Sequence, residues 1–298
     1  MNKHSYTADN YSLTPWQETW FKLRANRIAL AGLLLLIILT TCAVFAPVIV
    51  SHDPAEQFTD TLLAPPFWSQ GSNTDFILGT DDLGRDMFSR LLYGARYSLF
   101  LGFIIVSIAL VAGVFLGAVA GMKRGVIETV ILRLMDIMLS IPAILLAIVI
   151  VAILGASLAN AALAVSIVLL PHFVRITRAA VITEISKDYV MASRLDGSSG
   201  WKLLFRTLLP NISAPLIVQA TLSFSNAILD IAALGFLGLG AQPPTPEWGT
   251  LLSTSREFIE SAPWTVTLPG LAILITVLAS NLLGDGLRDA LDPRIDQQ

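Results

Sequence analysis

The sequence has few charged residues. Asp, Glu, Lys and Arg together make up 14% of its 298 residues, whereas an average soluble domain has about 25%. Apolar residues make up 54%, and the mean hydropathy is +0.70. This composition excludes the ordinary soluble class and indicates an integral membrane protein.

Residues that carry chemistry are also scarce. The single Cys42 excludes an internal disulfide and offers no metal cluster. His4, His52 and His172 are far apart, and none has a partner at metal-ligand spacing. No G-x-x-x-x-G-K-[ST] phosphate loop occurs, so the chain is not expected to hydrolyse ATP itself. We therefore expect no catalytic residue, no metal or cofactor bound by this chain, and no nucleic-acid partner.

Long uncharged runs fill most of the chain. The run at 137–174 has 38 residues and would be about 57 Å long as one helix, nearly twice the ~30 Å hydrocarbon core of a bilayer. We divide it near 155–157, with the first part beginning close to Glu128, and expect Pro142 and Pro171 to bend the two helices. Six transmembrane helices result, and the other four lie at about 28–50, 97–122, 212–240 and 262–283.

The basic residues test this division. With the N-terminus inside, six spans place 15 of the 19 Lys and Arg residues on the inner side, and treating 137–174 as one span would leave eight there. The positive-inside rule favours six spans. We therefore predict that both termini and the loop at 175–211 are cytoplasmic. Four arginines remain on the outer side: Arg85, Arg90, Arg96 and Arg256.

The other segments are polar or mixed. Residues 1–27 mix tryptophan with Lys and Arg, which suits a cytoplasmic interfacial segment on the lipid surface before the first span at 28–50. Residues 51–96 are predicted to form a periplasmic insertion with an amphipathic helix, and a solvated connector is the alternative. Residues 97–289 then make a core of five spans, and residues 290–298 a cytoplasmic tail.

The longest charged interval between two spans runs from Asp188 to Pro210 and reads DYVMASRLDGSSGWKLLFRTLLP. We expect two short helices in it. The first begins after a capping candidate, Ser186, and ends at Gly197, the residue best suited to the left-handed turn past a helix end. The second is closed by Pro210, and its apolar face contains Trp201, Leu204, Phe205 and Leu208. Such a surface between membrane spans indicates contact with a partner outside the membrane.

Two features suggest contacts between or along helices. Gly113, Gly117 and Gly121 follow one another at four-residue spacing, and small residues at this spacing let two helix backbones approach closely. Arg133 and Asp136 are three residues apart and are expected to pair near the membrane edge.

The charged loop carries a resemblance to a known family. DYVMASRLDGSSGWKLLFRTLLPN resembles the cytoplasmic signature of permease subunits of ABC importers, in which EAA, three residues and Gly are followed after nine residues by I-x-L-P. The chain departs from the pattern with Met191 for Glu, Ser193 for the second Ala and Thr207 for Ile. The residues that match at the right spacing are Ala192, Gly197, Leu209 and Pro210.

Two more segments extend the resemblance over essentially the whole chain. LGTDDLGRDMFSRLLYGARYSL and NAILDIAALGFLGLGAQPPTPEWGTLL resemble the C-type permease subunits of the peptide and nickel importers, and most closely those that carry dipeptides. The resemblance implies an all-α integral membrane fold, with a MetI-like ABC permease core preceded by an N-terminal helix and an outer-face insertion.

The resemblance also implies a location in a bacterial inner membrane, partners and a site. In such importers a second, B-type permease completes the pathway, two cytoplasmic ATPases use ATP and Mg²⁺, and a periplasmic binding protein delivers the peptide. The short helix of the signature loop docks into a cleft of the ATPase. The ATPase-coupling residues implied here are Asp188, Tyr189, Ala192, Ser193, Asp196, Gly197, Leu209 and Pro210.

Three polar residues inside the spans are candidates for the translocation pathway. Asp230 lies about 27 Å from the inner end of the fifth span, and an ionisable residue there usually faces a water-filled cavity or a polar partner. With Asn226 on the same face, it could attract the α-amine of a peptide. The alternative is a helix-end carboxylate satisfied by backbone amides or by the sister subunit. Asn281 fits either the pathway or a helix-packing hydrogen bond.

Several functions remain open. The first is half of the pathway of an ATP-driven importer of dipeptides or short peptides, with nickel, oligopeptide and antimicrobial-peptide importers as neighbours. The second is an ion-coupled secondary transporter, which needs midplane carboxylates, and Asp230 is the only good candidate for one. The third is a membrane scaffold without a transport role.

Overall fold

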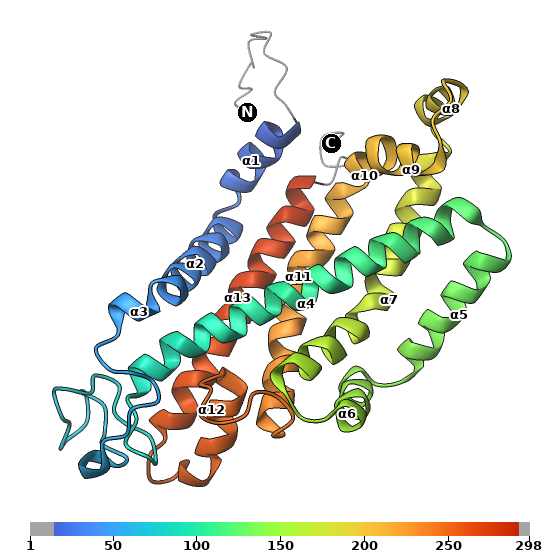
Figure 1. Cartoon of the computed structure of the whole chain (residues 1–298). Coiled ribbons are helices and arrows are strands. Elements are labelled where there is room, and N and C mark those ends of the chain that lie inside the picture. The colour runs from blue at the N-terminus through green and yellow to red at the C-terminus, as the bar shows by residue number, and fades with distance from the viewer. Residues whose placement is uncertain (1–14, 292–298) are drawn as a thin grey trace, which may run out of the picture.

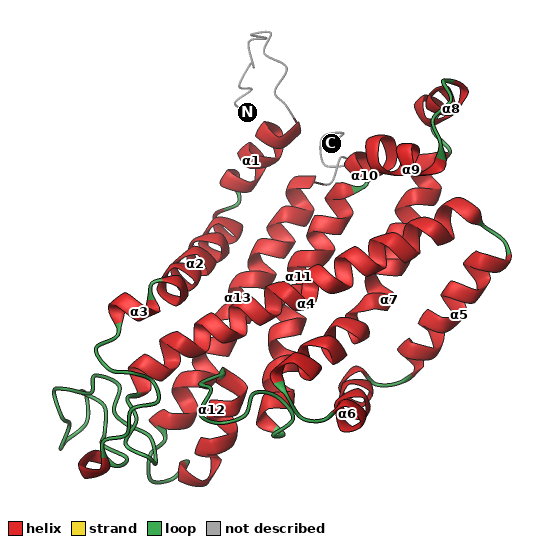
Figure 2. Cartoon of the chain, in the orientation of Figure 1, coloured by secondary structure: helices red, strands yellow, loops and turns green. Residues whose placement is uncertain are grey.

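The computed structural model describes residues 15–291, and helices and loops make up this part of the chain (Figures 1 and 2). Within it, the one isolated bridge of extended backbone joins Thr80 to Asp86. The expected all-helical class is confirmed for these residues. Residues 1–14 of the expected N-terminal segment and 292–298 of the expected tail lie outside the described residues.

The helices account for the expected spans. By length and composition, five of them could cross a membrane, and a sixth span results if α5 and α6 count as one broken span. A π-helical turn lies at Leu204–Leu208. In chain order the α-helices are α1 (Pro15–Ala25), α2 (Arg27–Val44), α3 (Ala46–Ile49), α4 (Met87–Lys123), α5 (Val126–Ser140), α6 (Ala143–Leu154), α7 (Leu158–Ile185), α8 (Asp188–Leu195), α9 (Gly200–Leu203), α10 (Leu209–Asn211), α11 (Ser213–Phe236), α12 (Trp248–Ser255) and α13 (Trp264–Leu291).

Helix α4 is the longest of these helices and lies along the front of the bundle in Figure 1. Asp86 caps it by accepting hydrogen bonds from the backbone amides of Phe88 (3.3 Å) and Ser89 (2.9 Å). The helix then continues unbroken for 37 residues, about 55 Å. The amphipathic helix expected before the second span is therefore the beginning of α4 itself, because no proline separates the two segments.

The three glycines at four-residue spacing lie where α4 contacts α7. A Cβ added to Gly117 would lie 2.6 Å from the carbonyl oxygen of Val174 and 2.7 Å from Cβ of Thr177. Gly113 and Gly121 make similarly close contacts with α7. The absence of side chains here lets the two backbones approach each other.

The third span is broken. Helices α5 and α6 are bent by 97° at a break next to Pro142, which confirms the bend expected at this proline. The division of the long uncharged run is also confirmed, because α6 ends at Leu154 and Ser157 caps the start of α7. Pro171, in contrast, lies inside α7, which is helical on both sides of it.

Ion pairs join α5 to α7. Arg175 donates to Asp136 with 2.5 Å between Nη2 and Oδ1, and Arg178 Nε donates to Glu128 Oε1 at 2.7 Å. The expected pairing of Arg133 with Asp136 is therefore wrong, because Asp136 contacts the neighbouring helix instead of its own.

The two ends of the bundle differ (Figure 1). Helices α1, α8, α9 and α10 and the last turns of α13 lie at one end, which we call the α8 end. The loops between α3 and α4, together with α6 and α12, lie at the opposite α12 end. At the α8 end, Leu23 and Ala29 pack against Ala290, which holds the first two helices on α13.

Candidate functional site

Helix α8 stands out from the bundle (Figure 1). Asp188 lies in its first turn, where the positive end of the helix dipole favours a carboxylate. Val190 is buried in an apolar cluster of the bundle, whereas the side chains of Met191 and Leu195 are 62% and 83% exposed. Exposed apolar residues on a charged helix at the end of a membrane bundle form a surface suited to a partner.

The two ends of α8 are formed differently. Ser186 does not cap the helix as expected, because its hydroxyl donates to the carbonyl of Thr183 on α7 (2.8 Å). At the other end Gly197 has a φ of +80°, and the amide of Ser198 donates to the carbonyl of Ser193 at 3.2 Å. This is the Schellman arrangement. An added Cβ at Gly197 would meet no atom within 4 Å, so backbone strain alone opposes a side chain there.

The second half of the loop is not one helix closed by proline. Helix α9 leads into the π turn and then into α10, so Pro210 lies in the first turn of α10. Proline is tolerated there because first-turn amides need no helical partner. The helical path therefore continues to Asn211, next to the start of α11.

The predicted apolar face of this segment is divided in two. Leu204 and Leu208 are buried against the bundle, whereas Trp201 and Phe205 are exposed. The Trp201 ring stacks on Phe115 of α4, with 5.7 Å between the ring centroids. The π turn changes the helical period, so residues at regular α-helical spacing no longer share one face.

The residues expected to contact an ATPase are mostly accessible. Ser193 is half-buried, and its hydroxyl lies 3.2 Å from that of Ser198 and 3.4 Å from that of Thr207, within the loop itself. Leu209 is half-buried and packs against the apolar cluster below α8. The six exposed ones are Asp188, Tyr189, Ala192, Asp196, Gly197 and Pro210.

A buried carboxylate beneath α8 was missed from the sequence. Glu184, in the last turn of α7, is 6% exposed and accepts hydrogen bonds from the Tyr189 hydroxyl and from Lys187 Nζ (3.0 Å). Tyr189 is 42% exposed overall. Partial desolvation and the hydrogen bond to Glu184 raise the pKa of Tyr189 to about 12, so its hydroxyl remains a proton donor at neutral pH. The sequence signal was an acidic residue at the negative end of a helix dipole, where it is unfavourable without partners.

The structure does not bring the three pathway candidates together. Asn281 on α13 accepts a hydrogen bond from Ser225 on α11 (2.7 Å) and so joins two helices. Asn226 is exposed and Asp230 half-buried, one turn apart on α11. No described residue hydrogen-bonds or ion-pairs with Asp230, so the alternative in which backbone amides of this chain satisfy it is not seen.

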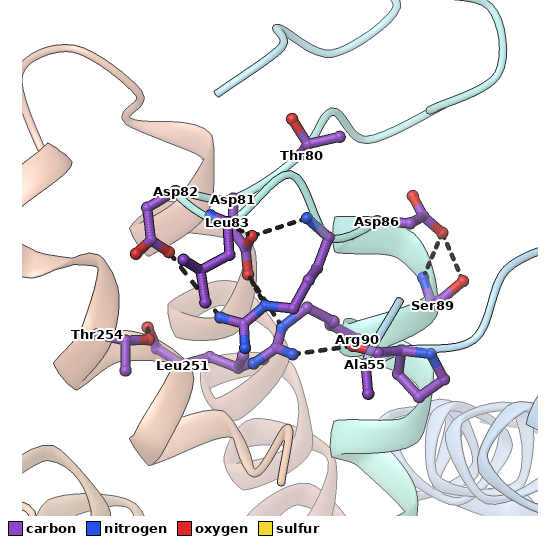
Figure 3. Close-up of polar contacts among 12 residues, drawn as sticks. Ala55, Thr80, Asp81, Asp82, Leu83, Asp86, Ser89, Arg90, Leu251 and Thr254 are labelled. Atoms are coloured by element: carbon purple, nitrogen blue, oxygen red, sulfur yellow. Dashed lines mark hydrogen bonds and ion pairs between the residues drawn. The ribbon is translucent and has the colours of Figure 1, made fainter. Parts of the chain in front are cut away.

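A buried cluster of charged residues at the α12 end connects the loops between α3 and α4 to the first turn of α4 (Figure 3). Arg85 Nε donates to Asp81 Oδ2 at 2.7 Å, and Arg90 Nε lies 3.3 Å from the same oxygen. Arg90 Nη1 also donates to the carbonyl of Pro54 (2.9 Å). Both arginines are less than 5% exposed, and the sequence analysis did not predict this burial. Their contacts indicate a structural role.

Glu247 at the start of α12 is a second buried acid that sequence reasoning missed. It is 0% exposed and accepts hydrogen bonds from Ser98 Oγ (3.1 Å) and from the amides of Gly249 and Thr250 (2.9 Å each). Burial raises the pKa of this carboxyl, while the hydrogen bonds act in the opposite direction. Among residues 15–291, no group of His, Cys, Asp or Glu could hold a metal ion.

Two family models match the chain. One is described as the binding-protein-dependent transport system inner membrane component and matches residues 113–297. The other is described as the N-terminal TM domain of oligopeptide transport permease C and matches residues 14–66. Together they include α2, α5 to α13 and the candidate site, while residues 67–112, with most of α4, lie between the two matches.

Characterised relatives match almost end to end. The chain is 56% identical to the di/tripeptide transport system permease protein DppC of Pseudomonas aeruginosa strain UCBPP-PA14, over 98% of this chain and 97% of that protein. It is 56% identical to the dipeptide transport system permease protein DppC of Escherichia coli strain K12, over 96% and 95%. It is 45% identical to the peptide transport system permease protein SapC of Shigella flexneri, over 91% and 92%.

A solved structure shares the fold. A chain of the MetNI methionine ABC transporter, crystallised in inward-facing conformations, aligns with a TM-score of 0.54 at 21% identity. The alignment covers 69% of this chain and 98% of that chain. This similarity supports the MetI-like fold expected for the permease core.

Proposed function

The chain belongs to the binding-protein-dependent transport system inner membrane components, as a C-type permease subunit of a peptide ABC importer, and we propose that its cargo is dipeptides and other short peptides. The observation that carries the proposal is identity above 50% with two dipeptide permeases over nearly the whole of each chain. The two matches extend through the core helices as well as the candidate site, because they cover 98% and 96% of this chain.

The energy for transport comes from other subunits. The sequence has no phosphate loop for ATP, and an ABC importer assembles from permease and ATPase subunits. We assign to this assembly one B-type permease, two cytoplasmic ATPases that use ATP and Mg²⁺, and a periplasmic binding protein. Helix α8 docks into an ATPase cleft, where the exposed Met191 and Leu195 would be buried.

The α8 end faces the cytoplasm in this proposal. Fifteen of the 19 Lys and Arg residues then lie on the inner side, as the positive-inside rule requires. The loops at the α12 end face the periplasm, where a binding protein delivers its peptide. Closure of the ATPases displaces α8, and the helices of the bundle switch the pathway between outward- and inward-facing states.

The pathway is lined in part by α11. Asp230 and Asn226 form a polar face on an apolar helix, and no described residue pairs with the carboxylate. A peptide carries a positively charged α-amine, which an unpaired carboxylate attracts in a region of low dielectric constant. Asn281 is left out of the pathway, because its amide oxygen already bonds Ser225.

Purification of the assembled importer tests the proposal. The chain, tagged and expressed with its genomic neighbours, should co-purify with two ATPases and a second permease. Gly197→Asp should reduce the recovered ATPase severalfold, because a side chain in the left-handed region costs about 1–2 kcal/mol and disturbs the end of α8. The matched control is Gly71→Asp, since Gly71 also has positive φ (+82°) and open space but lies in the loops between α3 and α4, far along the chain from α8. Normal ATPase recovery with Gly197→Asp would contradict the docking assignment.

A further inference from the structure

The last turn of α7 and the turn that connects it to α8, which together we call the corner, contain a carboxylate, Glu184, in an environment that disfavours its negative charge. Glu184 lies in the last turn of α7, where the backbone carbonyls give the helix a partial negative charge that repels an anion. Its side chain is also withdrawn from water, since the residue is 6% exposed. A buried charge at this end of a helix is stable only if donors compensate it. The donors therefore decide the geometry of the corner.

Two hydrogen-bond donors compensate the charge of Glu184, one from the turn after α7 and one from α8. Lys187 lies in the turn between the helices, where its side chain is 52% exposed, and an exposed ammonium contributes little and fixes no direction. Tyr189 lies on α8 itself, and its hydroxyl donates to Oε1 of Glu184. A hydrogen bond to a buried carboxylate is both strong and directional. It is thus the polar contact that sets the orientation of α8 relative to α7.

The other attachments of α8 restrict its direction less. Val190 contacts the bundle through an apolar cluster, and apolar contact is non-directional. The Ser193 side chain bonds, among the described residues, to hydroxyls of its own loop. Helix α7, in contrast, is joined firmly to the bundle: its backbone meets α4 at the glycines, and Arg175 and Arg178 pair with α5.

We propose that the Tyr189–Glu184 hydrogen bond is the joint through which displacement of α8 is passed to α7, and through α7 to α4 and α5. The inference rests on the proposed function, in which an ATPase moves α8. It reassigns the Tyr189 hydroxyl, which the family resemblance placed at the ATPase contact, to a contact within the chain. Tyr189 and Glu184 are then positioning residues for coupling: without the bond α8 still docks, but it moves without turning α7.

Uptake per ATP hydrolysed measures this coupling. The complete importer is reconstituted in liposomes with its binding protein, and radiolabelled dipeptide uptake and phosphate release are recorded together. Tyr189→Phe removes the hydroxyl and keeps the ring. We expect ATPase recovery and ATP hydrolysis to stay near wild type while uptake per ATP falls about fivefold or more, the lower end of couplings between linked sites. Tyr97→Phe is the matched control, because the Tyr97 ring is exposed and no described residue hydrogen-bonds its hydroxyl.

A second variant identifies the partner of the hydroxyl. Glu184→Leu removes the acceptor, and the double variant should lose no more than either single one, because both changes break the same bond. Wild-type uptake per ATP in Tyr189→Phe would overturn the proposal even if Glu184→Leu did not fold. Loss of ATPase recovery in Tyr189→Phe but not in Glu184→Leu would also overturn it, since the hydroxyl would then contact the ATPase. Failure of the wild-type chain to bind ATPases would instead refute the proposed function.

Discussion

Asp230 is a carboxylate whose surroundings within the described residues are incomplete. It is half-buried in the last two turns of α11, and no described residue hydrogen-bonds or pairs with it. A carboxylate in an apolar span is costly unless water, a cation or another subunit reaches it. The exposed Asn226 one turn earlier extends the same polar face. This face is completed either by a wet pathway or by the sister permease, and a single substitution separates the two.

We expect Asp230→Asn to raise the KM of dipeptide uptake about tenfold, because the neutral amide loses a charge-assisted contact worth about 1.5–3 kcal/mol. The shape of the side chain is retained, so the variant should assemble with its partners. Uptake by reconstituted importer as a function of peptide concentration checks this. Asp289→Asn is the control, because Asp289 is exposed near the end of α13. Unchanged kinetics together with weaker binding of the second permease would place Asp230 in the subunit interface.

At the level of residues, the sequence was a better guide to local backbone conformation than to contacts between side chains of different helices. The left-handed conformation of Gly197 was predicted correctly, because a glycine directly after a helix usually adopts it. Glu247 was missed because its partner Ser98 lies on a helix from elsewhere in the chain. Glu184 was missed although its partners Lys187 and Tyr189 follow within five residues, because spacing alone does not show how the turn after α7 folds back. Asp136 was assigned the nearest arginine in sequence, whereas Arg175, 39 residues later, is its partner. Spacing along one helix does not reveal which residues of a neighbouring helix lie opposite, so ion pairs between helices could not be predicted from the sequence.

Among the elements, the contact between α4 and α7 leaves no room for a side chain at its glycines. We expect Gly117→Ala to lower the stability of the protein by about 1–3 kcal/mol, the usual cost of an overpacked core, because the new Cβ would lie 2.6 Å from a backbone oxygen of α7. Gly270→Ala on α13 is the matched control, since its Cβ would meet no heavy atom closer than 4.0 Å. Thermal unfolding of both variants in detergent gives the comparison. Equal midpoints would show that the helices separate freely at Gly117.

Helix boundaries were predictable only where the chain carries a strong signal. Pro142 broke the third span as expected, and Ser157 began α7 close to the predicted division. The expected amphipathic helix and the second span form one continuous helix, which begins after the cap at Asp86. The π turn at Leu204–Leu208 had no sequence signal. Its effect is to divide a predicted apolar face between the bundle and solvent.

For the whole molecule, the six-span topology connects the local features. The α8 loop and the loops before α4 lie at opposite ends of the bundle (Figure 1). An odd number of crossings must therefore separate them, and α4, the α5–α6 pair and α7 supply three. The broken pair is the critical element, since neither half reaches across a ~30 Å core alone at 1.5 Å per residue. Only together can its 15- and 12-residue helices make a crossing.

Cysteine labelling tests this topology directly. In a Cys42→Ser background, which removes the single native thiol, Ser72→Cys places a thiol in the loops before α4 and Ser199→Cys places one next to α8. Both positions are exposed. We expect a membrane-impermeant maleimide to label Ser72→Cys in spheroplasts and Ser199→Cys only after permeabilisation, because three crossings put the two sites on opposite sides. Labelling of both sites in sealed spheroplasts would mean that α5 and α6 form a re-entrant loop, and would place α8 out of reach of any cytoplasmic ATPase.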